Sequence, residues 1–177
     1  MNRPVSFIVL VCQILSLVAC TNNPNTENDK QSGTKQIQEQ LVEANKEAVK
    51  IEKDQIDALI ARQGWQMNET GTGLRYIIYE NGSGEKAKTG KIARLNYEVK
   101  LITGDLVYSS KVDGIKEFRI GSGGVESGLE EGILLLRVGD KAKFIIPSYL
   151  AYGLAGDQSK IPPKATLIYD LELIELQ

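Results

Sequence analysis

Between Lys35 and Gln63 the apolar residues fall at helical spacing, in a segment that contains neither glycine nor proline. The residues that share this spacing are Ile37, Leu41, Ala44, Ala48, Ile51 and Ala58. Such a pattern predicts an amphipathic helix over residues 35–64, because positions three and four apart lie on one face of an α-helix. Gly64 would stop the helix, and Arg62 suits its last turn.

The apolar stripe of this helix has three interpretations. It can pack against its own globular domain, or it can pair with a second copy and form a homodimer through residues 35–63. Alanine-rich positions and Gln55 would make a weak coiled-coil seam. In the third interpretation the helix is a solvent-exposed spacer.

From Trp65 onward the pattern changes to a two-residue alternation, which is typical of half-buried strands. It is clearest from Ile92 to Ile102, and the turn residues Thr103–Asp105 after it indicate a hairpin. The predicted strands cover residues 74–80, 92–102, 106–108, 117–120, 141–147 and 166–175. In the last of them Leu167, Tyr169, Leu171 and Leu173 share one face.

One short helix is predicted from Ser127, where Ser127 and Glu130 have the spacing of a capping box. Glu130 and Glu131 suit the positive end of that helix, which explains them better than a catalytic carboxylate pair does. One helix among five or six antiparallel strands predicts an α+β domain over residues 65–177, with the sheet curled over the helix.

The N-terminus has the pattern of a bacterial lipoprotein signal. A positively charged start precedes an apolar run that is short for a membrane span, and Leu17-Val18-Ala19-Cys20 looks like a lipobox. We therefore expect a signal peptide over residues 1–19, a lipid anchor on Cys20, and a domain that faces the periplasm. A plain signal peptide or membrane anchor is the alternative. Residues 20–34 are almost wholly polar, which predicts a flexible tether.

Composition restricts the chemistry that is available. The chain has no histidine, its formal net charge is −2, and it has no basic cluster. If Cys12 leaves with the signal peptide and Cys20 carries lipid, no thiol remains for a disulfide, a metal or catalysis. We therefore expect no cofactor, no metal site and no nucleic-acid partner.

Several short motifs resemble, in order, those of the FKBP-type peptidyl-prolyl cis-trans isomerases, over roughly residues 71–176. They are Gly73-Leu74-x-Tyr76, Leu95-x-Tyr97, Ser109-Ser110, Gly128 to Gly132, Val138 to Ala142, Ile145 to Gly153 and Ile161 to Leu167. The resemblance implies an FKBP-like fold and an isomerase that binds proline-containing polypeptides during the folding of exported proteins. The segments in front resemble the FKBP-like lipoproteins associated with gliding motility.

The resemblance also implies roles for residues of an apolar pocket. Tyr152 would donate its hydroxyl, and Glu126 its backbone N–H, to substrate carbonyls. The other implied pocket residues are Tyr97, Val107, Tyr108, Val125, Leu129, Ile161 and Tyr169.

The pocket departs from the family pattern at several positions. Val107 and Tyr108 stand where the family has Phe-Asp, and Leu129 stands where it has a tryptophan floor. No aromatic residue occurs between Gly114 and Glu117, where the family has one. Two functions therefore remain open: a prolyl isomerase, or a non-catalytic peptide-binding chaperone or scaffold lipoprotein of an envelope machine.

Overall fold

The computed structural model describes the backbone of residues 25–177 and the side chains from Lys35 onward. The predicted signal peptide and the predicted lipidation site Cys20 lie outside the described residues. The chain divides into two compact units, and the division along the chain lies between Asn45 and Lys46. Helix α1 (Asn25–Gln63) contributes to both units.

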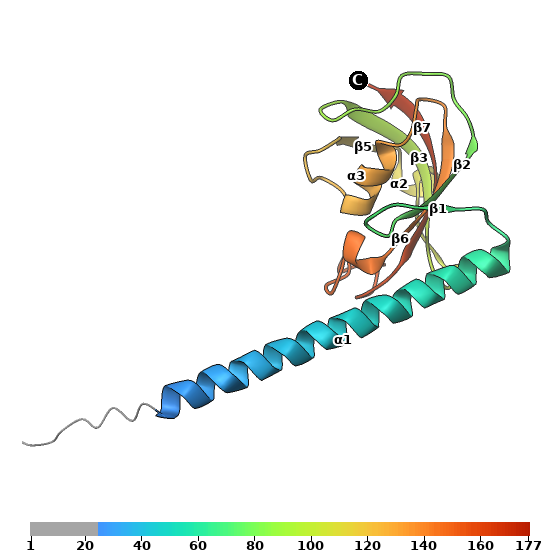
Figure 1. Cartoon of the computed structure of the whole chain (residues 1–177). Helices are drawn as coiled ribbons and strands as arrows, with labels where there is room; N and C mark the ends of the chain where they lie inside the picture. The colour runs from blue at the N-terminus through green and yellow to red at the C-terminus, as the bar shows by residue number, and fades with distance from the viewer. Residues whose placement is uncertain (1–24) are drawn as a thin grey trace, which may run out of the picture. The chain divides into compact units, whose positions relative to one another are not determined.

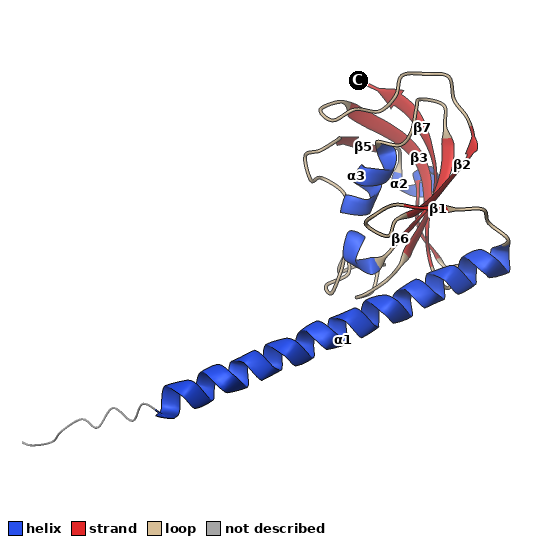
Figure 2. Cartoon of the chain, in the orientation of Figure 1, coloured by secondary structure: helices blue, strands red, loops and turns tan. Residues whose placement is uncertain are grey.

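Helix α1 begins ten residues earlier than the pattern predicts, at Asn25 rather than Lys35 (35 − 25 = 10). The flexible tether predicted over residues 20–34 overlaps this helix from Asn25 onward (Figure 2). The physical reason is cooperativity: extending an existing helix by one residue costs little, even where the residues are polar. None of the helices in the described part of the chain is long and apolar enough to cross a membrane.

The strands of the described chain form one antiparallel sheet with the order β1-β2-β6-β7-β3-β4, and β5 also pairs with β3 (Figure 1). Their bounds are β1 Asn68–Glu69, β2 Arg75–Glu80, β3 Ile92–Leu101, β4 Leu106–Ser109, β5 Lys116–Arg119, β6 Lys141–Ile146 and β7 Leu167–Leu176. Each predicted strand is present within one residue at either end. The sequence did not predict β1, the single turn α2 (Ser110–Asp113) or the 3₁₀ turn η1 (Ser148–Leu150).

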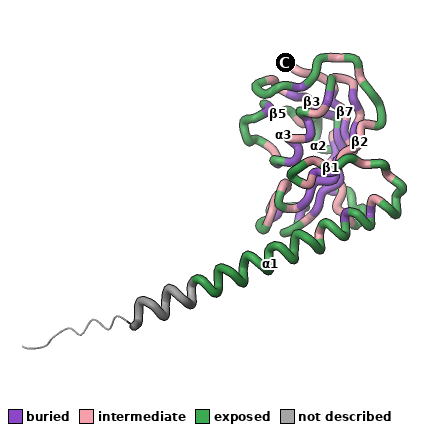
Figure 3. The backbone as a smooth tube through the Cα atoms, in the orientation of Figure 1, coloured by how far each residue is buried: buried purple, intermediate pink, exposed green. Residues whose placement is uncertain are grey.

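One face of the sheet packs against helix α3 (Ser127–Ile133), as the α+β prediction requires. Alternation places Leu95, Tyr97 and Val99 of β3 in this core, where they meet Leu129 and Ile133 of α3. Figure 3 shows the buried residues following the central strands and α3. Burial of these apolar side chains supplies the main stabilisation of the domain.

The opposite face of the sheet is covered by the last turns of α1. Ile56 and Leu59 are buried there against Ile145 of β6 and Ile168 of β7. Trp65 packs against the same cluster, as expected for a residue at the junction of helix and sheet. One interpretation of the helix, packing on its own domain, is therefore correct for this end of α1.

The residues that make the contact differ from the predicted stripe. Ile37, Leu41 and Ile51 are exposed, and so are the three alanines of the stripe. Helical spacing identifies an apolar face, but only the turns that precede the short connection after Gly64 reach the sheet. The buried positions there are Ile56 and Leu59, which the predicted stripe omitted.

The predicted capping box at the start of α3 is wrong. The N-cap residue is Glu126, and its side chain makes no capping hydrogen bond. The hydroxyl of Ser127 donates instead to the carbonyl of Leu150, and Glu130 accepts a hydrogen bond from the backbone N–H of Gly123. Both side chains therefore fasten neighbouring loops and do not close the helix end.

Candidate functional site

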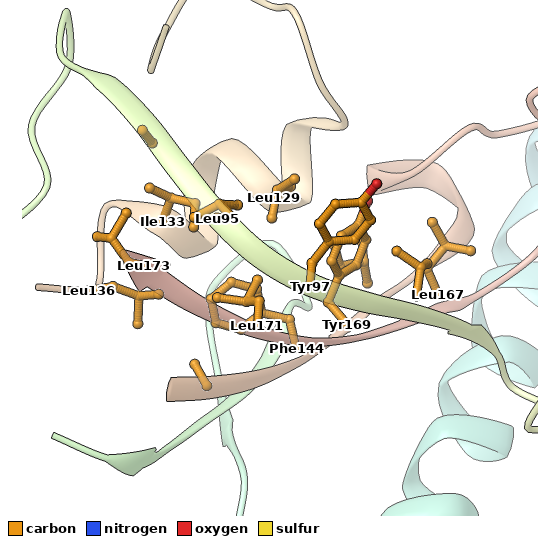
Figure 4. Close-up of a cluster of buried hydrophobic side chains, with 14 of the residues drawn as sticks. Leu95, Tyr97, Leu129, Ile133, Leu136, Phe144, Leu167, Tyr169, Leu171 and Leu173 are labelled. Atoms are coloured by element: carbon orange, nitrogen blue, oxygen red, sulfur yellow. The ribbon is translucent and has the colours of Figure 1, made fainter. Parts of the chain in front are cut away.

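Two tyrosine rings form the centre of the candidate site. Tyr97 extends from β3 and Tyr169 from β7, and neighbouring positions on paired strands bring their ring centroids to 6.4 Å with a tilt of 34°. Both are almost fully buried, and Figure 4 shows them side by side within the core cluster that includes Leu129 and Leu167. These aromatic faces provide an apolar, water-excluding wall.

The other predicted site residues lie in or against the same cluster. Val107 of β4, Leu129 of α3 and Ile161 are buried within it, and Tyr108, Val125 and Tyr152 are partly buried against it. Strands β3, β4 and β7, helix α3 and the loop between η1 and β7 therefore all contribute. The structure brings every apolar residue of the predicted pocket into one cluster.

Glu126 takes part through its side chain as well as its backbone. Its side chain is 95 % buried (5 % exposed), and its Oε1 accepts a 2.6 Å hydrogen bond from the hydroxyl of Tyr169. The second carboxylate oxygen, Oε2, is buried without a hydrogen-bond partner. A buried carboxylate is costly unless it is hydrogen-bonded, so the Tyr169 hydroxyl has a stabilising role here.

The two backbone groups of Glu126 differ in their hydrogen bonding. Its carbonyl accepts hydrogen bonds from the N–H groups of Leu129 and Glu130, which starts helix α3. Its own N–H makes no hydrogen bond within residues 25–177.

The phenol of Tyr152 is held in its protonated form. Burial, with the Glu126 carboxylate nearby, raises the pKa of Tyr152 well above its usual value. The same two causes raise the pKa of Tyr169. At neutral pH the Tyr152 phenol is protonated, as tyrosine normally is, and it can donate a hydrogen bond.

Two residues that the sequence reasoning missed also belong to the site. Lys116 of β5 places its ammonium 5.4 Å from the centroid of Tyr97 and 6.0 Å from that of Tyr169, within the range of cation–π attraction. Asp157 accepts a short hydrogen bond from the Tyr108 hydroxyl. Burial opposes ionisation of Asp157, but bonds from Tyr108 and from backbone amides lower its pKa overall. One indication of Lys116 was present in the sequence. The aromatic residue that the family has between Gly114 and Glu117 is missing here, and Lys116 lies in that stretch.

The described residues contain no group of acidic, cysteine or histidine side chains that could hold a metal ion. What the site does offer is a set of apolar walls, a protonated phenol and a backbone donor. That combination can bind a compact apolar ring and orient the carbonyls beside it. The Tyr152 phenol is protonated at neutral pH, so it does not act as a general base there.

Residues 83–174 match the model of the FKBP-type peptidyl-prolyl cis-trans isomerase family. The probable FKBP-type peptidyl-prolyl cis-trans isomerase FkpA of Neisseria meningitidis is 36% identical over 144 residues, which are 78% of this chain and 52% of that protein. FK506-binding protein 2 of Dictyostelium discoideum is 43% identical over 90 residues, or 50% of this chain and 68% of that protein.

The fold is also that of a solved relative. The crystal structure of FkpA from Escherichia coli matches with a TM-score of 0.64 and 30% identity, covering 86% of this chain and 71% of that one. The chain spans about half the length of the Neisseria relative that it matches. The rest of the Neisseria protein lies outside the match.

Proposed function

Because the chain belongs to the FKBP-type peptidyl-prolyl cis-trans isomerase family, we propose that it accelerates cis-trans rotation about Xaa-Pro bonds. Its substrates would be proline-containing segments of unfolded, exported polypeptides. The supporting observation is a protonated Tyr152 phenol packed against a buried cluster that contains Tyr97 and Tyr169.

The reaction needs only a binding site that favours a twisted amide. A trans peptide bond must pass a barrier of about 18–20 kcal/mol, and without help an Xaa-Pro bond takes tens of seconds or longer. At the top of the barrier the amide has lost resonance and is less polar than in the planar ground state. A dry wall of Tyr97, Tyr169, Leu129 and Ile161 therefore favours the twisted state over the planar one.

Two donors would fix the substrate around the rotating bond. The hydroxyl of Tyr152 would bind one carbonyl, and the backbone N–H of Glu126 would bind another. Holding the flanking groups while the bond turns lowers the entropic part of the barrier. No proton is transferred and no bond is broken, so a chain without histidine can carry out this reaction.

The test is the isomerisation rate of short Xaa-Pro peptides with purified protein and with a Tyr152→Phe variant. Loss of a neutral hydrogen bond is worth about 0.5–1.5 kcal/mol, so kcat/KM should fall by roughly 2- to 12-fold. Tyr149→Phe is the matched control. Tyr149 precedes the same loop, but its hydroxyl donates to the carbonyl of Thr72 at 2.9 Å. Equal rates for the Tyr152→Phe variant and wild type would remove the role assigned to this hydroxyl.

A second candidate function is non-catalytic binding of polypeptides, as a chaperone or as a scaffold of an envelope machine such as one for gliding. The observation that favours it is the charge within the site, namely the Glu126 carboxylate and the Lys116 ammonium. This candidate predicts that the protein suppresses aggregation of an unfolded client without accelerating proline isomerisation.

The proposal includes a place in the bacterial envelope. A lipid on Cys20 would anchor the chain with the domain facing the periplasm, and mass spectrometry of the mature N-terminus tests for the acyl chains. Pairing of two chains through residues 35–63 is part of the proposal as an alternative to a monomer. Exposure of Ile37, Leu41 and Ile51 is consistent with that pairing, and sedimentation measures it.

A further inference from the structure

One carboxylate of helix α1 binds both ends of the loop that carries Tyr152 and Ile161. Oε1 of Glu52 accepts hydrogen bonds from the backbone N–H of Ser148 and from the hydroxyl of Thr166, both at 2.6 Å. Oε2 accepts from the Ser148 hydroxyl at 2.9 Å. Ser148 opens η1 and Thr166 directly precedes β7, so Glu52 fastens the base of the loop between them.

The interior of that loop is tied by its own hydrogen bonds. Oδ1 of Asp157 accepts from the N–H groups of Ser159 and Ile161, at 2.9 and 2.7 Å. The N–H of Lys164 donates to the carbonyl of Gly153 at 2.7 Å. The two ends of the loop leave the paired strands β6 and β7, whose last partners are Ile146 and Leu167. Glu52 binds Ser148 and Thr166, just beyond that pair, and so ties both ends of the loop to helix α1 as well.

Glu52 is itself placed by a docked helix. One turn further along α1, Ile56 is 2 % exposed and packs against the sheet. The next residue, Asp57, makes a 2.9 Å ion pair with Arg75, which is 5 % exposed and also pairs with Glu69. The helix therefore presents the Glu52 carboxylate from a fixed backbone.

We propose that Glu52 is a positioning residue for prolyl isomerisation: it fixes the loop between Ser148 and Thr166, and with it the Tyr152 phenol, to helix α1. The claim rests on the proposed function. It also makes the later turns of α1 part of the working domain, because a shift of these turns would move a side chain that binds both ends of the loop.

Hydrogen exchange tests the fastening without reference to catalysis. In the full protein, Glu52→Ala should speed exchange of the Gly153 and Lys164 amides about tenfold or more, since hydrogen bonds to a charged group are worth at least that factor. Amides in the middle of β3 report global unfolding and should change less. The matched control is Asp54→Ala, which removes an exposed carboxylate from the same helix.

Two further variants separate the fastening from general damage to the helix. Glu52→Gln keeps an Oε1 acceptor for Ser148 and Thr166 and should recover part of the protection. Thr166→Val preserves the shape of a buried side chain and removes one bond only, so exchange should accelerate less than in Glu52→Ala. Protection that is unchanged in all three variants would overturn the fastening.

The kinetic readout is the dependence of the Glu52 effect on Tyr152. If Glu52 acts by positioning the phenol, Glu52→Ala should lower kcat/KM of the wild-type protein by no more than the 2- to 12-fold expected of Tyr152→Phe. In a protein that already carries Tyr152→Phe, Glu52→Ala should have little further effect on kcat/KM. Effects that multiply independently would refute the positioning role. A wild-type protein without isomerase activity would refute the proposed function, and the exchange result would still decide whether Glu52 holds the loop.

Discussion

The buried pair of Glu126 and Tyr169 leads to a quantitative prediction for Tyr169→Phe. The substitution removes a hydroxyl from a side chain that is 1 % exposed, and the ring stays in place. It also takes from Glu126 the donor that its Oε1 accepts at 2.6 Å, while Oε2 already lacks a partner. Because a hydrogen bond to a charged group contributes about 1.5–3 kcal/mol, the free energy of unfolding should fall by about that amount.

Replacing both partners should cost much less than replacing either one. Glu126→Leu alone leaves the Tyr169 hydroxyl buried without its acceptor, a loss of about 1–3 kcal/mol. In the double variant Glu126→Leu/Tyr169→Phe both polar groups are gone, so neither is left unpaired. We expect the double variant to lie close to wild type in stability, which corresponds to a coupling free energy of about 2.5–6 kcal/mol in magnitude.

Urea unfolding followed by fluorescence measures all four proteins. Trp65 is the only tryptophan, and it packs against the cluster beneath α1, so its emission reports loss of the fold. Tyr149→Phe serves as the control, because it removes one neutral hydrogen bond at an exposed residue and should cost about 0.5–1.5 kcal/mol, less than Tyr169→Phe. Single-variant losses that simply add in the double variant would refute the claim that this pair is energetically linked.

Two other predictions concern the titration of the site and the docking of the helix. Burial raises the pKa of Tyr97, Tyr152 and Tyr169 above their usual value of 10, so these residues stabilise the fold fully below pH 10 and progressively less above it; the urea midpoint should fall between about pH 9 and 12. An unchanged midpoint would contradict the burial of these phenols. Ile56→Ala should lower stability by about 2–5 kcal/mol because it opens a cavity beneath α1, whereas Ile51→Ala, at a residue 50 % exposed on the same helix, should change it by about 0.5 kcal/mol or less. Similar losses from both variants would show that the helix end is not docked as described.

The strands could be predicted from sequence because each has a face whose burial follows a fixed period. In β3, Leu95 and Tyr97 point into the core and Asn96 points to solvent, and this difference is visible in the order of the residues. Glycine and polar clusters marked the turns between strands. Local periodicity and turn composition were therefore sufficient to locate the longer strands, but they did not indicate the two-residue strand β1 or the order of the strands in the sheet.

The capping box failed because a local signal competed with distant partners. Ser127 and Glu130 have the right spacing, but Ser127 donates to Leu150, 23 positions away. Glu52 shows the same limit on a larger scale, since its partners Ser148 and Thr166 are 96 and 114 positions distant. No pattern within a short window of sequence encodes such pairs.

The site was located by family motifs, and these too have a physical limit. They indicated Tyr97, Tyr152 and Tyr169 because those residues match positions in the family. They gave no reason to expect Lys116 over the rings, or a buried Glu126 side chain beside Tyr169. A family motif predicts which position has a given role. It does not predict the contacts of a residue that differs from the family, because those contacts depend on the neighbouring side chains.

Two tyrosine hydroxyls of the site are bonded to acidic side chains of other segments. The Tyr169 hydroxyl donates to the Glu126 carboxylate, and the Tyr108 hydroxyl donates to Asp157. Each pair therefore joins two separate segments around the candidate site. With Glu52 fixing the ends of the loop from outside, the Tyr152 phenol is held in place before any substrate binds. Preorganised donors need no rearrangement when the amide twists, so these bonds would favour the proposed isomerisation by keeping the site in one arrangement.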